Sequence, residues 1–143
     1  ATPEAIECCQ LLADLIARAL EGAEKTQLRR APLLKLSQPK VVAIAQGEYL
    51  HKAETEIKGS GYSVQSLEAA LWCFHHTQTF AEAVLKAANL GDDADTTAAI
   101  AGQLAGAYYS ARAIPEHRLE QLHEGEEIPA TADRLLEASR LRT

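Results

Sequence analysis

Three aspartates and two threonines gather in the chain at residues 91–97, Gly-Asp-Asp-Ala-Asp-Thr-Thr. An apolar run without a helix breaker follows from Ala98, so this stretch is predicted to be a turn that leads into the N-terminus of a helix. A carboxylate at that place caps the helix and suits its partial positive charge. Capping explains one aspartate but not three, because neighbouring carboxylates repel each other unless a cation lies among them.

We single out Asp93, Asp95 and Thr96 as candidate ligands for a metal ion. Two carboxylates and a hydroxyl are hard oxygen donors of the kind that Mg²⁺, Mn²⁺ and Ca²⁺ prefer. An EF-hand loop starting at Asp93 is excluded, because its sixth and twelfth positions hold Ala98 and Leu104 instead of Gly and Glu. The residues alone leave two interpretations open, a helix cap and a divalent-cation site.

A second group that could bind a ligand is Gly59, Ser60, Gly61 and Tyr62. Two glycines that flank a serine free backbone N–H groups to approach an anion, and Tyr62 adds a surface for stacking or hydrogen bonding. The group is not a dinucleotide fingerprint, because the third glycine would fall at Val64 and no strand precedes it. An ordinary tight turn with Tyr62 packed on the core remains the alternative.

Apolar residues recur at helical spacing along most of the chain, and no segment shows sustained period-two alternation. Helices are predicted over residues 3–22, 39–49, 64–75 and 80–89, from the acidic turn to residue 109, and over 115–122 and 131–142. Thr79 and Glu82 have capping-box spacing at the start of the fourth helix. Gly102 and Gly106, among alanines of the fifth, predict a close approach by a neighbouring helix. The fold class is therefore all-α, with six to seven helices.

Composition excludes several classes of protein. The 143 residues suffice for one domain, and the net charge of −6 without a Lys/Arg block disfavours nucleic-acid binding. No apolar run is long enough to span a membrane, no signal-peptide pattern occurs, and three cysteines make neither a disulfide framework nor a zinc motif. We therefore expect a cytoplasmic protein. Because the chain has no Met and starts at Ala1, we also expect that an N-terminal part is missing.

Residues 91–100 and the following residues 102–109 resemble the ADP-ribosylglycohydrolase family, which includes dinitrogenase reductase-activating glycohydrolases and ADP-ribosyl-acceptor hydrolases. A second match runs from Gly59 to Tyr62 and continues through residues 66–72, with the family's order and separation. The resemblance covers about residues 5–122. It implies an all-α bundle around two divalent cations, Mg²⁺ or Mn²⁺, which hold the distal ribose of ADP-ribose and a water that attacks its anomeric carbon.

The resemblance also implies roles for the residues already singled out. Asp93, Asp95 and Thr96 would be metal ligands, and the segment from Gly59 to Tyr62 would be part of the wall that meets ADP-ribose. The family's upstream Thr/Ser-Asp-Asp motif, its N-terminal Gly-Asp segment and an acid often assigned to catalysis are not found in the chain. The resemblance therefore implies a single all-α domain over residues 1–143 or the C-terminal half of a larger one, with the catalytic residues in the missing half.

The expected function is that of a C-terminal portion of a metal-dependent ADP-ribosylglycohydrolase, incomplete alone, which cleaves the N- or O-glycosidic bond between ADP-ribose and an acceptor. Its expected partners are an ADP-ribosylated protein or small molecule and the N-terminal half of the same fold, with no nucleic acid and no membrane. Two alternatives stay open. One is a non-catalytic ADP-ribose-binding or crystallin-like structural relative, and the other is a helical module whose acids bind Ca²⁺ structurally.

Overall fold

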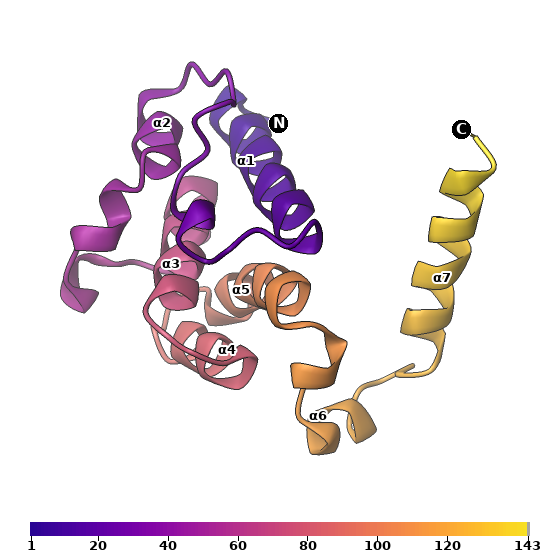
Figure 1. The fold of residues 1–143 in the computed structure, drawn as a ribbon. Helices are drawn as coiled ribbons and strands as arrows, with labels where there is room; N and C mark the ends of the chain where they lie inside the picture. The colour runs from indigo at the N-terminus through magenta and orange to yellow at the C-terminus, as the bar shows by residue number, and fades with distance from the viewer. Residues whose placement is uncertain (143) are drawn as a thin grey trace. The chain divides into compact units, whose positions relative to one another are not determined.

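The computed structural model describes residues 1–142, and these form helices and connecting turns with no β-strand among them (Figure 1). The seven α-helices are α1 (Pro3–Leu20), α2 (Pro39–Ala45), α3 (Ser63–His75), α4 (Phe80–Ala88), α5 (Ala94–Tyr109), α6 (Glu116–Glu120) and α7 (Glu127–Arg140). Short 3₁₀ turns lie at Gln27–Arg29, Glu48–His51, Glu54–Glu56 and Ala111–Ala113. The predicted all-α class is confirmed.

The chain divides into two compact units, Ala1–Ala113 and Ile114–Thr143. The predicted single domain over residues 1–143 stays a prediction, and Thr143 lies outside the described residues. No helix in residues 1–142 combines the length and the apolar character that crossing a lipid bilayer requires.

The helix ends in the first unit follow local chemistry. Thr79 accepts a hydrogen bond from the N–H of Glu82 at 3.1 Å, and the Glu82 carboxylate accepts one from the N–H of Gln78 at 2.8 Å. The predicted capping box is therefore present at the start of α4. In contrast, α2 ends at Ala45 and not near residue 49, because Gly47 adopts a left-handed φ of +80° and turns the chain into a 3₁₀ segment.

The core of the first unit forms around α3, which contacts α1, α2, α4 and α5 (Figure 1). Nine of the 13 residues of α3 are buried. Trp72 lies in this core, and its indole N–H donates to the carbonyl of Lys52 at 3.0 Å. Helix α5 also packs against α1 and α4, so its position is fixed on three sides. The N-terminus of α5, where the acidic turn lies, therefore rests on a well-packed support.

Neither helix of the second unit, α6 or α7, has a buried residue. Helix α7 begins at Glu127, four residues before the predicted start at Thr131. The predicted start was wrong because Pro129 suggests a loop, since proline cannot donate a backbone hydrogen bond. Proline is tolerated in the first turn of a helix, where the backbone N–H groups have no partner within the helix.

Candidate functional site

A sharp turn connects α4 to α5 and sets the direction of the acidic residues. Gly91 and Asp92 both have left-handed backbone angles, with φ of +81° and +52°. Glycine adopts this conformation without steric cost, and aspartate tolerates it better than most residues do. The two residues reverse the chain and place Asp93 directly before the first residue of α5.

The backbone of Asp93 is anchored on both sides. Its N–H donates to the carbonyl of Gly59 at 2.8 Å, and its carbonyl accepts from both the N–H and the hydroxyl of Thr97, each at 3.1 Å. Thr97 is fully buried. The half-buried Asp93 side chain makes no capping hydrogen bond. The helix-cap interpretation therefore does not account for this carboxylate.

The segment that begins at Gly59 lies directly against the acidic turn. A Cβ atom at Gly59 would come within 2.9 Å of Thr97 Oγ1, a distance that real Cβ atoms do not reach. A Cβ atom at Gly61 would lie 3.4 Å from Asp93 Oδ2. The two groups singled out from the sequence, far apart along the chain, are thus adjacent in the fold.

Asp95 and Thr96 lie in the first turn of α5, and both are exposed. Hydrogen bonding with the Asp93 side chain, and then with the backbone N–H of Thr96 at 3.0 Å, lowers the pKa of Asp95 below its usual value. Among the residues that the structure describes, neither Asp93 nor Asp95 forms an ion pair with a basic side chain. Two close carboxylates therefore meet solvent without a cationic partner from this part of the chain.

This donor set fits a hard divalent cation, but only in part. Asp93, Asp95 and Thr96 offer carboxylate and hydroxyl oxygens, which suit Mg²⁺ or Mn²⁺. Across residues 1–142, no cluster of three or more His, Cys, Asp or Glu side chains is arranged to hold a metal ion. These residues can therefore supply some of the ligands of a cation, and the other ligands must come from water, substrate or other protein groups.

Ser60 is held by the start of α3. Its hydroxyl donates to the side-chain oxygen of Gln65, and its carbonyl accepts from the hydroxyl of Ser66. Ser66 is buried, at 2% exposure. The segment between Gly59 and Tyr62 is therefore a fixed part of the fold.

Tyr62 connects three helices through its hydroxyl group. The hydroxyl donates to the carboxylate of Glu4 in α1 and accepts from the ammonium of Lys40 in α2 at 3.2 Å. The same ammonium lies 5.1 Å from the centre of the Tyr62 ring. Sequence reasoning missed Glu4 and Lys40, because no spacing rule links residues that meet only when three helices pack together.

An apolar pocket of about 290 Å³ lies beside the acidic turn, between α1, α3 and α5. Gly61 and Thr96 are on its lining, together with Cys8 and Ile100. Burial raises the pKa of the Cys8 thiol to about 11, so this group is neutral and unreactive near neutral pH. The acidic turn thus has a polar side formed by carboxylates and an apolar side formed by the pocket.

With this geometry in view, comparison with known proteins identifies the family. The sequence model of the ADP-ribosylglycohydrolase family matches residues 1–143. The chain belongs to the ADP-ribosylglycohydrolase family. The resemblance found in the sequence around the acidic turn is thereby confirmed.

Several relatives within this family are similar over most of the chain. ADP-ribosylarginine hydrolase Tri1 of Pseudomonas putida (strain GB-1) is 43% identical over 134 residues, 94% of this chain and 36% of the relative. The Tri1 protein of Serratia proteamaculans (strain 568) is 39% identical over 93% of this chain and 36% of the relative. ADP-ribosyl-[dinitrogen reductase] glycohydrolase of Rhodospirillum rubrum is 40% identical over 46% of this chain and 22% of the relative.

A solved structure supports the same assignment at the level of the fold. An "ADP-ribosylglycohydrolase-related protein complex" aligns with a TM-score of 0.80 and 40% identity, over 91% of this chain and 46% of that chain. The chain thus spans about a third of the length of the Tri1 relatives and less than half of the solved chain.

Proposed function

We propose that this chain contributes part of the active site of an ADP-ribosyl glycohydrolase, which hydrolyses the bond between ADP-ribose and an acceptor. The observation that carries the proposal is the acidic pair Asp93 and Asp95, anchored against Gly59 in a member of this family. Relatives bear the names ADP-ribosylarginine hydrolase and ADP-ribosyl-[dinitrogen reductase] glycohydrolase. Both names favour an ADP-ribosylated protein as the substrate.

In this proposal Asp93, Asp95 and Thr96 hold a divalent cation, Mg²⁺ or Mn²⁺, one of two in the site. When bound, such ions orient the hydroxyls of a sugar and make water a better nucleophile at neutral pH. Contacts with the segment at Gly59 and Gly61 hold these ligand residues in place. The hydrogen bond from Asp93 N–H to Gly59 fixes the backbone, and the missing side chain at Gly61 leaves Asp93 Oδ2 open. We place the remaining ligands and the catalytic acid outside this chain.

We further propose that Gly59, Ser60, Gly61 and Tyr62 form part of the wall that contacts ADP-ribose. Without side chains at the two glycines, a ligand can approach the backbone closely. The contacts of the Tyr62 hydroxyl with Glu4 and Lys40 fix the orientation of the ring. A rigid wall beside the acidic pair positions a ligand without a large ordering cost.

The test compares two isosteric charge removals in the protein at its natural length. Release of ADP-ribose from an ADP-ribosylarginine peptide is measured with Mg²⁺ or Mn²⁺ for wild type, Asp95→Asn and Asp92→Asn. We expect Asp95→Asn to lower kcat/KM on the order of 100-fold or more, because a ligand of the cation is lost. Asp92→Asn keeps the left-handed turn and is expected to retain near wild-type activity.

Three results would contradict the proposal. Equal turnover by wild type and Asp95→Asn would show that the acidic pair has no role in the hydrolysis. Binding of ADP-ribose in calorimetry, without hydrolysis under any metal condition, would favour the non-catalytic relative instead. A rise in stability with Ca²⁺, but not with Mg²⁺ or Mn²⁺, would favour the structural calcium site.

A further inference from the structure

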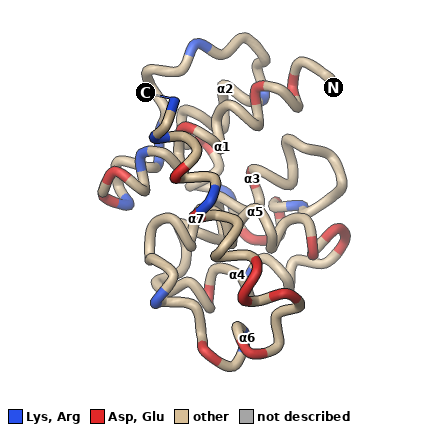
Figure 2. The backbone as a smooth tube through the Cα atoms, turned by 90° about the vertical axis from the view of Figure 1, so that its right-hand side faces the viewer, with Lys and Arg blue, Asp and Glu red and all other residues tan. Residues whose placement is uncertain are grey.

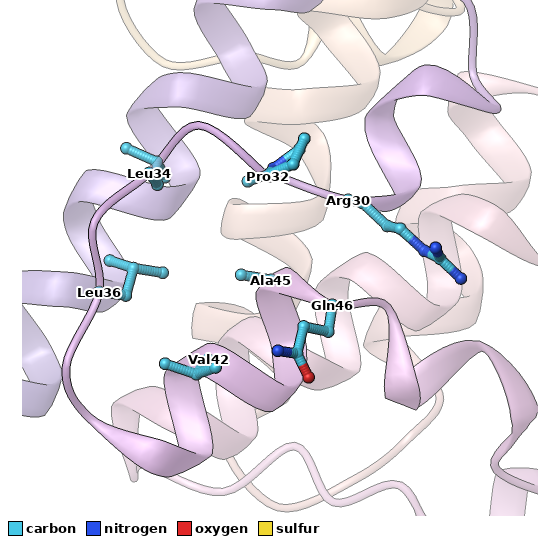
Figure 3. A pocket seen from close by; sticks show the side chains of 8 residues that line it. Arg30, Pro32, Leu34, Leu36, Val42, Ala45 and Gln46 are labelled. Carbon is cyan, nitrogen blue, oxygen red and sulfur yellow. The ribbon is translucent and has the colours of Figure 1, made fainter.

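A second pocket lies away from the acidic turn, between the loop at residues 30–36 and helix α2 (Figure 3). Its cavity has a volume of about 330 Å³. Pro32, Leu34 and Leu36 line it from the loop, and Val42 and Ala45 line it from α2. Figure 3 shows the loop arching around this space, with Leu36 extending from it toward Ala45. Six of the eight lining residues are therefore apolar, and Arg30 and Gln46 supply a polar part of the wall.

Side chains from α1 hold the loop at both ends. Near its start, the guanidinium of Arg18 donates to the carbonyl of Arg30 at 2.7 Å. Near its end, the carboxylate of Glu7 accepts from the backbone N–H of Ser37 at 2.8 Å and from its hydroxyl at 2.7 Å. The pocket is thus formed before any ligand arrives, so little ordering of the loop is required on binding.

The segment that forms this pocket has a charge opposite to that of the whole chain. Acidic residues outnumber Lys and Arg by 20 to 14 in the whole chain, yet residues 25–47 contain five Lys or Arg and no Asp or Glu. Figure 2 shows both kinds of charged residue along the backbone. Lys25 and Lys40 of this segment bond to Tyr109 and Tyr62. The side chains that remain are Arg29, Arg30 and Lys35, of which Arg30 lines the pocket and the other two are its neighbours along the chain. These three are exposed and form no ion pair with the residues that the structure describes.

We propose that this pocket docks an acidic segment of a partner protein that inserts one branched aliphatic side chain between the loop and α2. The cavity is at the small end of the range for ligand sites, so it suits one or two side chains better than a large cofactor. Gln46 lies on the lining and offers both a donor and an acceptor to the backbone of such a segment. Arg29, Arg30 and Lys35 attract its carboxylates. Three separate charges are too few for a nucleic-acid surface.

The first experiment uses the protein at its natural length and a fluorescein-labelled synthetic peptide with a central leucine among glutamates and aspartates. Binding is followed by fluorescence anisotropy and located by backbone and methyl NMR. We expect saturable binding that weakens with salt and shifts the methyl signals of Leu34, Leu36 and Val42. A peptide with serine in place of leucine is expected to bind at least about tenfold more weakly, since the apolar contact is lost.

Variants of the protein separate the apolar and the charged contributions. Val42→Asp places a carboxylate in the pocket and is expected to abolish binding. The double variant Arg30→Glu and Lys35→Glu alters only exposed side chains, so it keeps the test valid if Val42→Asp does not fold; we expect about tenfold weaker binding. Arg112→Glu, an exposed charge reversal in the same unit, is the matched control and should bind as wild type does.

Several results would overturn the proposal. These are equal binding of the leucine and serine peptides, no binding of either, or equal binding by the double variant and Arg112→Glu. Methyl shifts at this pocket that depend on protein concentration alone would assign it to a second copy of the chain. Displacement of the peptide by an RNA oligonucleotide at the same signals would assign the surface to nucleic acid.

Discussion

Groups of opposite charge lie at the two ends of α5, and they differ in the partners that the fold gives them. At the C-terminal end, the ammonium of Lys25 donates to the Tyr109 hydroxyl at 2.7 Å and to the carbonyl of Thr77, and it lies 4.6 Å from the centre of the Phe74 ring. At the N-terminal end, the side chains of Asp93 and Asp95 interact with each other, and Asp95 accepts one hydrogen bond from the backbone N–H of Thr96.

Both arrangements suit the helix dipole, which favours cations at the C-terminus and anions at the N-terminus. The dipole therefore does not separate a structural charge from a functional one. Contacts within the chain separate the two. The ammonium of Lys25 has two hydrogen-bond partners and an aromatic ring of the same fold, whereas the acidic pair has no basic partner among the described residues and is accessible to solvent.

The largest effect on the free energy of unfolding is expected from His75, which lies near the C-terminal end of α5. Its ring nitrogens are buried without a well-aligned hydrogen bond among the described residues, and its ring meets Phe74 edge-on at 4.9 Å. Burial, and then repulsion from Lys25 and Arg29, lowers the pKa of His75 to about 3.

Because His75 stays neutral in the folded protein, its contribution to the free energy of unfolding is complete at any pH above about 6.5, which is its pKa in the unfolded chain. It is lost as the pH falls from there toward 3, since only the unfolded chain then gains the proton. The expected loss is on the order of 3–5 kcal/mol. Urea unfolding at several pH values should show a shallower acid loss for His75→Leu than for wild type. The exposed control His51→Leu should keep the wild-type slope, and an unchanged slope in His75→Leu would refute this assignment.

At the N-terminal end, the next largest effect is expected from the glycine that touches α5. Gly59→Ala would force a Cβ atom to within 2.9 Å of Thr97 Oγ1, so we expect a destabilisation of about 1–3 kcal/mol in chemical unfolding. Thr97→Ala removes the opposing oxygen. The double variant should therefore be less destabilised than the sum of the two single variants.

Gly102→Ala is the matched control within α5. Its new methyl group would lie 3.6 Å from Val84, an ordinary contact. This variant should be neutral or more stable by up to about 1 kcal/mol, because alanine favours a helix interior. Equal losses for Gly59→Ala and Gly102→Ala would show that the contact at Gly59 is not tighter than the others.

These glycines also show what the sequence could and could not predict. The helical periodicity predicted α3, α4 and α5 to within one or two residues, except at the first turn of α5, because apolar spacing is a local property. The stripe of Gly102 and Gly106 marked the face on which α4 packs, but it did not give a distance. Among these glycines the closest contact is at Gly59, which lies in a turn and reaches α5 only through the tertiary fold.

In the candidate site too, local spacing was predictable from the sequence and tertiary contacts were not. Asp93, Asp95 and Thr96 were found because their spacing within one turn is visible in the sequence. The partners that hold the site, Thr97 and the carbonyl of Gly59, were not, because a buried hydroxyl in a small-residue helix resembles any other core position. Adjacent residues cannot share one helical face, so the sequence predicts surface or capping roles for both His75 and His76. This is right for His76, which follows the last residue of α3, and wrong for His75, whose ring nitrogens are buried.

A smaller effect is expected from the satisfied amine at the C-terminal end of α5. Lys25→Met keeps the length of the side chain but removes two hydrogen bonds and the cation above two aromatic rings. Thermal or chemical unfolding should show a loss of about 1–2 kcal/mol. Lys35→Met, an exposed lysine without such contacts, should change stability by less than about 0.5 kcal/mol. Equal effects of the two variants would mean that Lys25 is as loosely held as a surface residue.

The smallest change in stability is expected where the proposed function is strongest. Without added metal, the double variant Asp93→Asn and Asp95→Asn should unfold within about 2 °C of wild type, because relief of repulsion offsets the lost attraction to the helix N-terminus. Mn²⁺ should then raise the unfolding midpoint of wild type and of Asp92→Asn, but not that of the double variant, since a ligand stabilises only a protein that binds it. A large loss of stability without metal would make the acids structural, like Lys25. A Mn²⁺-dependent rise that survives in the double variant would place the cation elsewhere, and the contrast between the two ends of α5 would no longer separate binding from packing.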